Sequence, residues 1–397
     1  MIMEPKNWNV YLFRDILERV EVPVNVESNK EYVQIGIRSH GKGLFYKEPV
    51  LGKALGNKQV FWIQPNCFIL NVVFAWEQAI TKTTENELGM IGSHRFPMYR
   101  PKNDLVDIDY LIYYFLTKRG TDILEAASPG GAGRNRTLGQ ERFLKSKITL
   151  PPLPEQQKIA TILSTQDKVI ELKEKLLAQK QQQKKYLMQQ LLNRKKRLPG
   201  FDRKWNYVKA NEIFKSIVDK SHGGKLEVLS STQDKGIVPR SQVDIDIKYD
   251  ENSLSTYKKV CEGDFVISLR SFQGGIEYSN YAGIVSPAYT VLRAIVKIDA
   301  GYYKQFFKSS NYIKRLNVAV YGIRDGKQIS YDDFGQIKIP VPPIEEQREV
   351  AKILSTADHE IDLLQKSIEA EKQKKKALMQ LLLMGKARVE DEQRQDG

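Results

Sequence analysis

The chain contains one segment of sixteen residues twice, and the two copies start 191 residues apart. Residues 150–165 read LPPLPEQQKIATILST, and residues 341–356 read VPPIEEQREVAKILST. The similarity continues more weakly to Leu187-Met188-Gln189 in one copy and Leu378-Met379-Gln380 in the other. A repeat of this length predicts a duplicated unit of about domain size, and with it pseudo-twofold symmetry. Two like modules related in this way suit a two-sided ligand, for which duplex DNA is the leading candidate.

The charge of the chain also favours a polyanionic partner. Its 62 Lys and Arg against 48 Asp and Glu give a formal net charge of +14 and a pI of about 9.4. The excess is concentrated between residues 155 and 204, which hold 13 basic and 5 acidic residues. A balance this basic is typical of proteins that bind nucleic acid.

Cysteine usage and hydropathy limit the class of protein further. Cys67 and Cys261 lie in different halves of the chain without Cys-x-x-Cys spacing, which predicts neither a disulfide framework nor a zinc site. No apolar run reaches the length of a membrane span, and the N-terminal residues MIMEPKNWNV do not resemble a signal peptide. We therefore expect a cytoplasmic protein with reduced thiols, no membrane association, no metal and no cofactor.

The stretches that follow the two Pro-Pro pairs predict long helices. Residues 154–194 and 344–384 have no internal Pro or Gly, and their apolar residues recur at steps of three and four. Pro199-Gly200 cannot continue the first helix, and the polar tail after Gly385 is expected to be loose. Because so long an amphipathic helix is only marginally stable alone, each should pair with its copy, antiparallel. The alternative is that each helix packs only on its own domain.

The remaining stretches predict two mixed, β-rich domains that are weakly related. Trp8-Asn9 matches Trp205-Asn206, and Phe68 falls opposite Phe265 in a strand-like run. The expected fold class is α+β, with two mixed α/β domains separated by two long α-helices that pack as an antiparallel, pseudo-twofold symmetric coiled coil. The expected boundaries are 1–149 and 199–340 for the domains, 150–198 and 341–388 for the helical spacers, and 389–397 for the tail.

This order of segments resembles the specificity (S) subunit of type I restriction–modification systems. The resemblance covers essentially the whole chain and rests on the duplicated Pro-Pro-x-x-Glu-Gln motif, the Gln- and Lys-rich helix after it, and Leu-Pro-Gly-Phe followed by a tryptophan. It implies a non-catalytic subunit in which each target-recognition domain reads one half of a split duplex DNA sequence. It also implies that the helices set the gap and dock two methyltransferase (M) subunits, with restriction–translocase (R) subunits completing the complex.

Glycine-flanked basic segments are the candidate DNA readers of the second domain. Ser268-Leu-Arg-Ser-Phe-Gln-Gly-Gly follows a strand-like run, and its Arg270 and Gln273 suit guanine and adenine edges respectively. Tyr321-Gly-Ile-Arg-Asp-Gly-Lys offers Arg324 and Lys327. The structural alternative is that Gly274-Gly275 forms a hairpin turn and that the arginines are solvated or paired with acids.

The first domain has no arginine at the corresponding stretch, Ala75-Trp76-Glu77-Gln78, where Trp76 is expected to be a core residue. Its basic candidates are Arg95, in Ser93-His94-Arg95, and the group Arg134, Asn135 and Arg136 after the glycine-rich segment Pro129-Gly-Gly-Ala-Gly. Glycine-rich loops let backbone approach a phosphate closely, so some of these contacts position the protein rather than specify sequence.

The end and the start of the helices supply the other candidates. Arg194, Lys195, Lys196 and Arg197 are expected to face DNA phosphates, although charge runs on long helices are more often solvated or turned toward a partner. Each Pro-Pro corner is followed by Glu and Gln in the first helical turn, where the helix dipole favours a carboxylate. We expect Glu155, Gln156, Glu346 and Gln347 to tie the helices to a domain or to a partner subunit.

No motif of a catalyst is present. The Pro-Pro pairs lack the Asn or Asp and the aromatic residue that frame a flipped adenine, and Gly322-Ile-Arg-Asp-Gly-Lys-Gln is too short for a P-loop. Two other hypotheses stay open. The chain could be a stand-alone DNA-binding or architectural protein without M subunits, or a degenerate enzyme with an unrecognised nuclease site.

Overall fold

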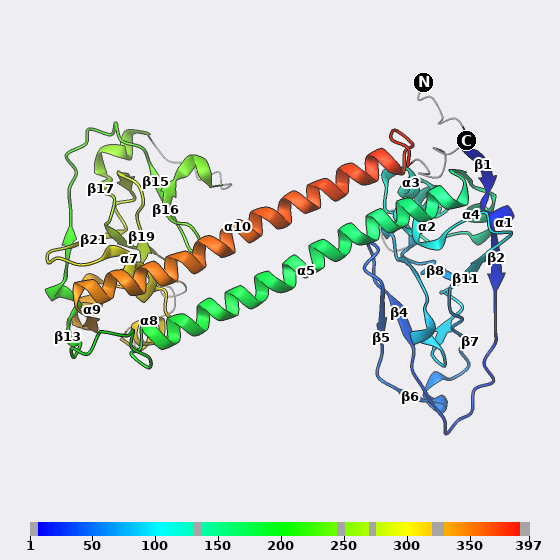
Figure 1. Cartoon of the computed structure of the whole chain (residues 1–397), viewed down its shortest axis with the longest axis horizontal. Helices are drawn as coiled ribbons and strands as arrows, with labels where there is room; N and C mark the ends of the chain where they lie inside the picture. The colour runs from blue at the N-terminus through cyan, green and yellow to red at the C-terminus, as the bar shows by residue number, and fades with distance from the viewer. Residues whose placement is uncertain (1–6, 131–135, 244–250, 270–274, 320–328, 390–397) are drawn as a thin grey trace. The chain divides into compact units, whose positions relative to one another are not determined.

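The computed structural model describes residues 7–130, 136–243, 251–269, 275–319 and 329–389 (Figure 1). It divides into two compact units. Unit 1 comprises Met1–Lys173 with Ser367–Gly397, and unit 2 comprises Glu174–Lys366. Each unit therefore contains one mixed domain together with a part of each long helix. Among the described residues, no helix combines the length and the apolar character needed to cross a membrane.

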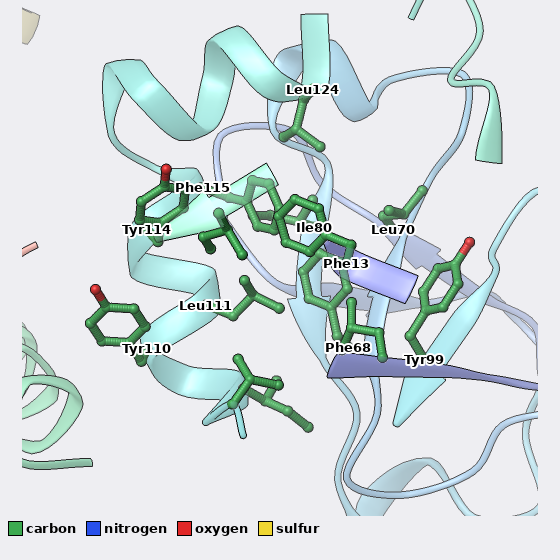
Figure 2. Close-up of a cluster of buried hydrophobic side chains, with 14 of the residues drawn as sticks. Phe13, Phe68, Leu70, Ile80, Tyr99, Tyr110, Leu111, Tyr114, Phe115 and Leu124 are labelled. Atoms are coloured by element: carbon green, nitrogen blue, oxygen red, sulfur yellow. The ribbon is translucent and has the colours of Figure 1, made fainter. Parts of the chain in front are cut away.

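Unit 1 is built on an antiparallel sheet of four strands in the order β2-β11-β8-β9. Its strands are β2 (Leu17–Val20), β11 (Met98–Pro101), β8 (Phe68–Leu70) and β9 (Ile80–Lys82), and the helices of the domain are α1 (Phe13–Ile16), α2 (Ile108–Phe115), α3 (Lys118–Ala126) and α4 (Gln140–Lys145). Stacked rings join the sheet to the helices, since Phe68 of β8 lies 5.5 Å from Phe115 of α2, and Phe13 of α1 lies 4.7 Å from Phe143 of α4, centroid to centroid. Figure 2 shows this core, with Phe68 and Ile80 from the sheet beside Leu111 and Phe115 from α2.

Shorter strand pairs complete unit 1. The first strand of the domain pairs with its last, so that Asn9 lies opposite Leu150 and the chain enters α5 directly beside its own start. The pairs are β1 (Asn9–Leu12) with β12 (Lys147–Leu150), β3 (Glu31–Tyr32) with β6 (Val50–Leu51), β4 (Ile35–Ile37) with β5 (Leu44–Tyr46), and β7 (Val60–Trp62) with β10 (Ile91–Ser93).

Unit 2 repeats this architecture. Its four-stranded sheet has the order β14-β21-β18-β19, and Phe265 opens β18 as Phe68 opens β8, which confirms the predicted relationship between the domains. The sheet consists of β14 (Phe214–Ile217), β21 (Thr290–Ala294), β18 (Phe265–Ile267) and β19 (Glu277–Tyr278). The strand pairs are β13 (Asn206–Lys209) with β22 (Lys338–Val341), β15 (Leu229–Thr232) with β16 (Gly236–Pro239), and β17 (Lys258–Val260) with β20 (Gly283–Val285). The helices are α7 (Ala300–Phe307), α8 (Ser310–Ala319) and α9 (Tyr331–Gln336).

The two long helices are α5 (Leu153–Leu191) and α10 (Ile344–Leu382), drawn green and orange-red in Figure 1. Both start where the Pro-Pro pairs predict, but both end three or two residues earlier than expected. The reason is a left-handed residue after each helix, Arg194 with φ 58° and Gly385 with φ 65°, a conformation that closes a helix end. These two positions correspond in the repeat.

The helices run antiparallel within each unit. In unit 1, Gln166 and Lys173 of α5 donate to the carboxylate of Glu371 at 2.7 Å, and Lys375 pairs with Asp167 at 2.5 Å. In unit 2, the ammonium of Lys180 lies 2.7 Å from Glu360, and Lys184 pairs with Asp358. The predicted antiparallel pairing is thus confirmed in both units.

Each domain core is sealed by both helices, so the alternative in which a helix packs only on its own domain is wrong. The unit 1 core takes in Ile159 and Leu163 from the start of α5 together with Leu382 from the end of α10. The unit 2 core takes in Leu191 from the end of α5 and Leu354 from the start of α10. The expectation of a loose tail after Gly385 is also wrong as far as residue 389, because Ala387 and Val389 pack against the unit 1 core.

Candidate nucleic-acid interface

The first-turn glutamines tie each long helix to its domain. The side-chain oxygen of Gln156 accepts a hydrogen bond from the backbone N–H of Asp107 at 2.9 Å, and its amide donates to Pro151 O at 2.8 Å. Gln347 repeats both contacts, with the N–H of Asp299 at 2.9 Å and Pro342 O at 2.8 Å. Asp107 and Asp299 in turn cap α2 and α7. Both glutamines are fully buried, so a helix-to-domain bond explains their presence in both copies.

The first-turn glutamates hold an arginine that follows the other helix. In unit 2, Arg197 donates to both carboxylate oxygens of Glu346, which is 1 % exposed, and the indole N–H of Trp205 adds a third bond at 2.8 Å. In unit 1, Arg388 donates to both oxygens of Glu155 at 2.8 Å. Sequence reasoning missed Arg388, although the repeat spacing of 191 relates it to Arg197.

The predicted basic run after α5 divides into two roles. Arg194, Lys195 and Lys196 are exposed in unit 2, and their side chains make no hydrogen bond or ion pair with any described residue. Their predicted role at DNA phosphates stays a prediction. Arg197 is different, because its guanidinium is taken up by Glu346 and lies over the ring of Trp205 at 5.7 Å. Arg197 therefore links the end of α5 to the first turn of α10.

Two of the basic candidates of unit 1 come together at the end of β8. Val72 donates its N–H to Arg95 O at 3.0 Å and accepts from Leu138 N–H at 2.8 Å, which places the segments around residues 72, 95 and 138 side by side. Arg95 is exposed, and the guanidinium of Arg136 lies 5.6 Å from the ring centroid of Trp76. Arg134 and Asn135 lie outside the described residues.

Trp76 is not the core residue that its sequence context predicts. It is partly exposed and belongs to none of the buried hydrophobic clusters of the described chain. Its indole N–H donates to Val73 O at 3.0 Å, which fixes the ring at the tip of the β8–β9 connection. The misassignment has a physical reason, since a lone tryptophan beside a buried strand gives no signal in the sequence for which way it points.

The candidate loops of unit 2, with Arg270 and Gln273 in one and Arg324 and Lys327 in the other, lie outside the described residues. The border of the first loop is well fixed. Gly275 has φ +87°, and a Cβ there would lie 2.4 Å from Phe307 O, so only glycine fits against the end of α7. Two residues later, the buried carboxylate of Glu277 pairs with Lys308, whose ammonium also donates to Gln233 O at 3.1 Å. The described residues that follow this loop, Gly275 to Glu277, are thus held against the end of α7, and Lys308 links them to the turn between β15 and β16.

Burial changes the pKa of the Glu277 carboxyl group. Desolvation raises the pKa of Glu277 to about 7, against the opposing effect of the Lys308 ammonium, and Asp234 adds to the rise. One carboxylate oxygen of Glu277 has no hydrogen-bond partner among the described residues. The described part of the chain contains no group of three or more His, Cys, Asp or Glu able to hold a metal ion.

Comparison with known proteins agrees with this architecture. The family model described as "Type I restriction modification DNA specificity domain" matches the chain twice, over residues 27–181 and 202–372. A curated relative, the type I restriction enzyme MjaVIII specificity subunit of Methanocaldococcus jannaschii, is 26 % identical over 98 % of this chain and 94 % of its own.

Two solved structures share the fold. The HsdS subunit of Thermoanaerobacter tengcongensis aligns with a TM-score of 0.55 and 20 % identity over 97 % of this chain and 98 % of that one. A chain from a structure of a type I restriction–modification system, reported on complex assembly and conformational transition, aligns with a TM-score of 0.60 and 19 % identity. It covers 97 % of this chain and 100 % of that chain.

Proposed function

This chain belongs to the family of type I restriction–modification DNA specificity subunits, and from that premise we propose that each of its units reads one half of a split duplex DNA target. In this proposal the chain reads the DNA, holds the methyltransferase subunits and sets the gap between the half-sites. Methylation and cleavage are carried out by M and R subunits in the cytoplasm, and the chain itself is non-catalytic.

One observation carries this proposal. The two units have the same sheet order and the same helix anchors, yet the residues that connect the third and fourth strands differ in sequence between them. Residues 71–79 of unit 1 contain Trp76 and no glycine, whereas residues 268–276 of unit 2 contain Arg270 and two glycines. A duplicated frame that presents different side chains at one position is what two different half-sites require, because base edges are distinguished by the groups that meet them.

A second observation supports the docking of two copies of one partner. Leu172 of α5 is 53 % exposed, and Leu363 of α10, its counterpart at the repeat distance of 191, is 52 % exposed. Two large apolar side chains at corresponding positions suit two identical protein surfaces. In this proposal Leu172 and Leu363 each contact one M subunit, whereas the buried Gln156 and Gln347 contact none.

The helices α5 and α10 set the number of base pairs between the half-sites in this proposal. Inserting four residues after Ala178, with a matching insertion in α10, lengthens the pair by about 6 Å. The gap in the recognised sequence should then change by one or two base pairs. An unchanged gap with full activity would exclude this role.

The experiment that tests the function is a genome-wide map of N6-methyladenine in the source cell, with and without this gene. Two short half-sites around a fixed gap, lost on deletion, are the expected result. If no such motif depends on the gene while the purified protein still binds DNA without a methyltransferase, the chain is a stand-alone DNA-binding protein. Metal-dependent cutting by the purified chain would place catalysis in it.

Docking is tested separately by the mass of the complex. Leu172→Glu and Leu363→Glu should each remove one M subunit, and the double variant should remove both. Gln182→Glu, at an exposed position of α5, is the matched control and should leave the stoichiometry unchanged. Two bound M subunits in both leucine variants would contradict the assignment.

A further inference from the structure

The turn that carries Trp76 is rigid. It contains η2 (Ala75–Glu77) and is closed by Asn71 N–H to Ala79 O at 2.9 Å and Ala79 N–H to Phe74 O at 3.1 Å. The side chain of Gln78 donates to Thr121 Oγ1 at 2.6 Å and so fastens the turn to α3. A partly exposed indole on a fixed turn costs little conformational entropy when it meets a ligand.

A basic loop lies directly against this turn. The loop joins β4 to β5 and comprises residues 38–43, Arg-Ser-His-Gly-Lys-Gly. His40 donates its N–H to Glu77 O at 2.8 Å, and Gly41 donates to Gln78 O at 2.9 Å. The hydroxyl of Ser39 donates to the carboxylate of Glu77 at 3.0 Å, so the acid at this place is already engaged.

The first of the two glycines of the loop favours this contact. Gly41 has φ +62°, a conformation that is strained for any other residue, and a Cβ there would lie 2.6 Å from a methyl group of Leu116, which would have to move. The backbone bonds to Glu77 and Gln78 hold the loop in place, and the guanidinium of Arg38 donates to Leu44 O and lies 5.2 Å from the ring centroid of Phe45. Arg38, His40 and Lys42 are exposed, and Lys42 makes no hydrogen bond or ion pair with the described residues.

We infer that the η2 turn and the loop of residues 38–43 form one DNA-contacting surface of unit 1, in which Trp76 meets base edges and Lys42 meets phosphate. This rests on the proposed function and identifies which residues of unit 1 perform it. Trp76 occupies the same place in the sheet order as the loop with Arg270 in unit 2. Arg136 lies over its ring, and basic groups beside a partly exposed aromatic ring are a combination that binds nucleic acid.

Trp76 and Lys42 have separable roles. An indole in a groove makes apolar contact with base edges such as the thymine methyl group, and so discriminates between sequences. An ammonium on a phosphate strengthens binding to every sequence alike and makes it depend on salt. Arg136 acts through the ring of Trp76 and is a positioning residue.

The test uses the full chain assembled with its methyltransferase partner, and reads the methylated motif together with binding to a target duplex. Trp76→Ala should relax one position in one half-site, with a loss of discrimination of about 10- to 100-fold, and leave the other half-site unchanged. Lys42→Gln should weaken binding to target and non-target duplexes equally and reduce the slope of log K against log salt by about one. Lys58→Gln, an exposed lysine of the same unit outside this surface, should change neither.

The outcomes separate this inference from the function on which it rests. If the wild-type complex shows no split motif, the proposed function itself fails. If it shows one that Trp76→Ala and Lys42→Gln both leave intact, with the salt slope unchanged, only the assignment of this surface is overturned. Should Trp76→Ala not fold, Arg136→Gln replaces it, with weaker discrimination in the same half-site expected, and Lys42→Gln remains decisive for the loop.

Discussion

The guanidinium of Arg197 donates to both carboxylate oxygens of Glu346, at 2.7 and 2.9 Å, across 149 residues of sequence. The same pair recurs between Arg388 and Glu155 in unit 1. In each unit, the arginine that follows one long helix thus meets the first turn of the other. Buried charge pairs of this kind are costly to break, because removal of one partner leaves the other charge uncompensated.

Arg197→Ala should therefore destabilise unit 2 by about 3 kcal/mol or more, since Glu346 is 1 % exposed and would keep only the indole N–H of Trp205. Hydrogen exchange of core amides in unit 2 is the measurement, and the loss corresponds to roughly 100-fold faster exchange. Lys195→Ala, at an exposed position two residues earlier, should stay within about 0.5 kcal/mol of wild type. Equal exchange in the two variants would show that the pair adds nothing.

Gln347→Ala should destabilise unit 2 by about 2 to 4 kcal/mol, because it leaves the N–H of Asp299 and the carbonyl of Pro342 buried without their partner. The corresponding change in unit 1, Gln156→Ala, should speed exchange in unit 1 and spare the core of unit 2. The matched control is Gln157→Ala on the exposed side of the same turn, with an expected change near zero. Loss of stability in the wrong unit would contradict the anchoring role.

The long helices were the most predictable part of the chain. Apolar spacing, the Pro-Pro corners and the absence of internal Gly and Pro are local properties, and they give the two helices to within three residues at each end. The antiparallel pairing follows from the repeat. The left-handed Arg194 could not be predicted, because arginine rarely adopts a positive φ.

The side-chain roles were less predictable, because they depend on partners that are distant in the sequence. Arg197 belongs to a run of four basic residues, and nothing in the sequence of that run distinguishes it from Lys195. In the structure, however, Arg197 forms an ion pair with Glu346. The surroundings of Trp76 likewise come from Arg136 and from a loop some 35 residues before it in the sequence. Only the repeat could have indicated the structural role of Arg197, because a spacing of 191 residues relates it to Arg388, which forms the matching ion pair.

Lys195 and Lys196 are expected to contact DNA phosphates, as exposed cations without a partner among the described residues. The double variant Lys195→Ala with Lys196→Ala should reduce the slope of log K against log salt by about two and weaken target and non-target duplexes equally. Titration of a labelled duplex at several salt concentrations measures both quantities. Lys58→Ala serves as the control in unit 1. A changed target sequence with an unchanged salt slope would mean that these lysines read bases.

Glu277 should make the stability of unit 2 depend on pH. Burial raises its pKa from 4.5 to about 7, so the folded unit binds this proton more tightly than the unfolded chain does. The resulting stabilisation is complete below pH 4.5 and is lost as the pH rises through 7, with an upper limit of about 3 kcal/mol. Glu277→Gln removes the titration while nearly conserving shape, so its unfolding free energy relative to wild type should rise between pH 4.5 and 7.

Lys308 and Asp234, which face the carboxylate, are unchanged in that comparison. As a control, Glu262→Gln, at an exposed position, should give a plot of unfolding free energy against pH that is parallel to that of wild type. A Glu277→Gln curve that is also parallel would mean that the carboxylate keeps its proton equilibrium on folding, and that Lys308 offsets its burial in full.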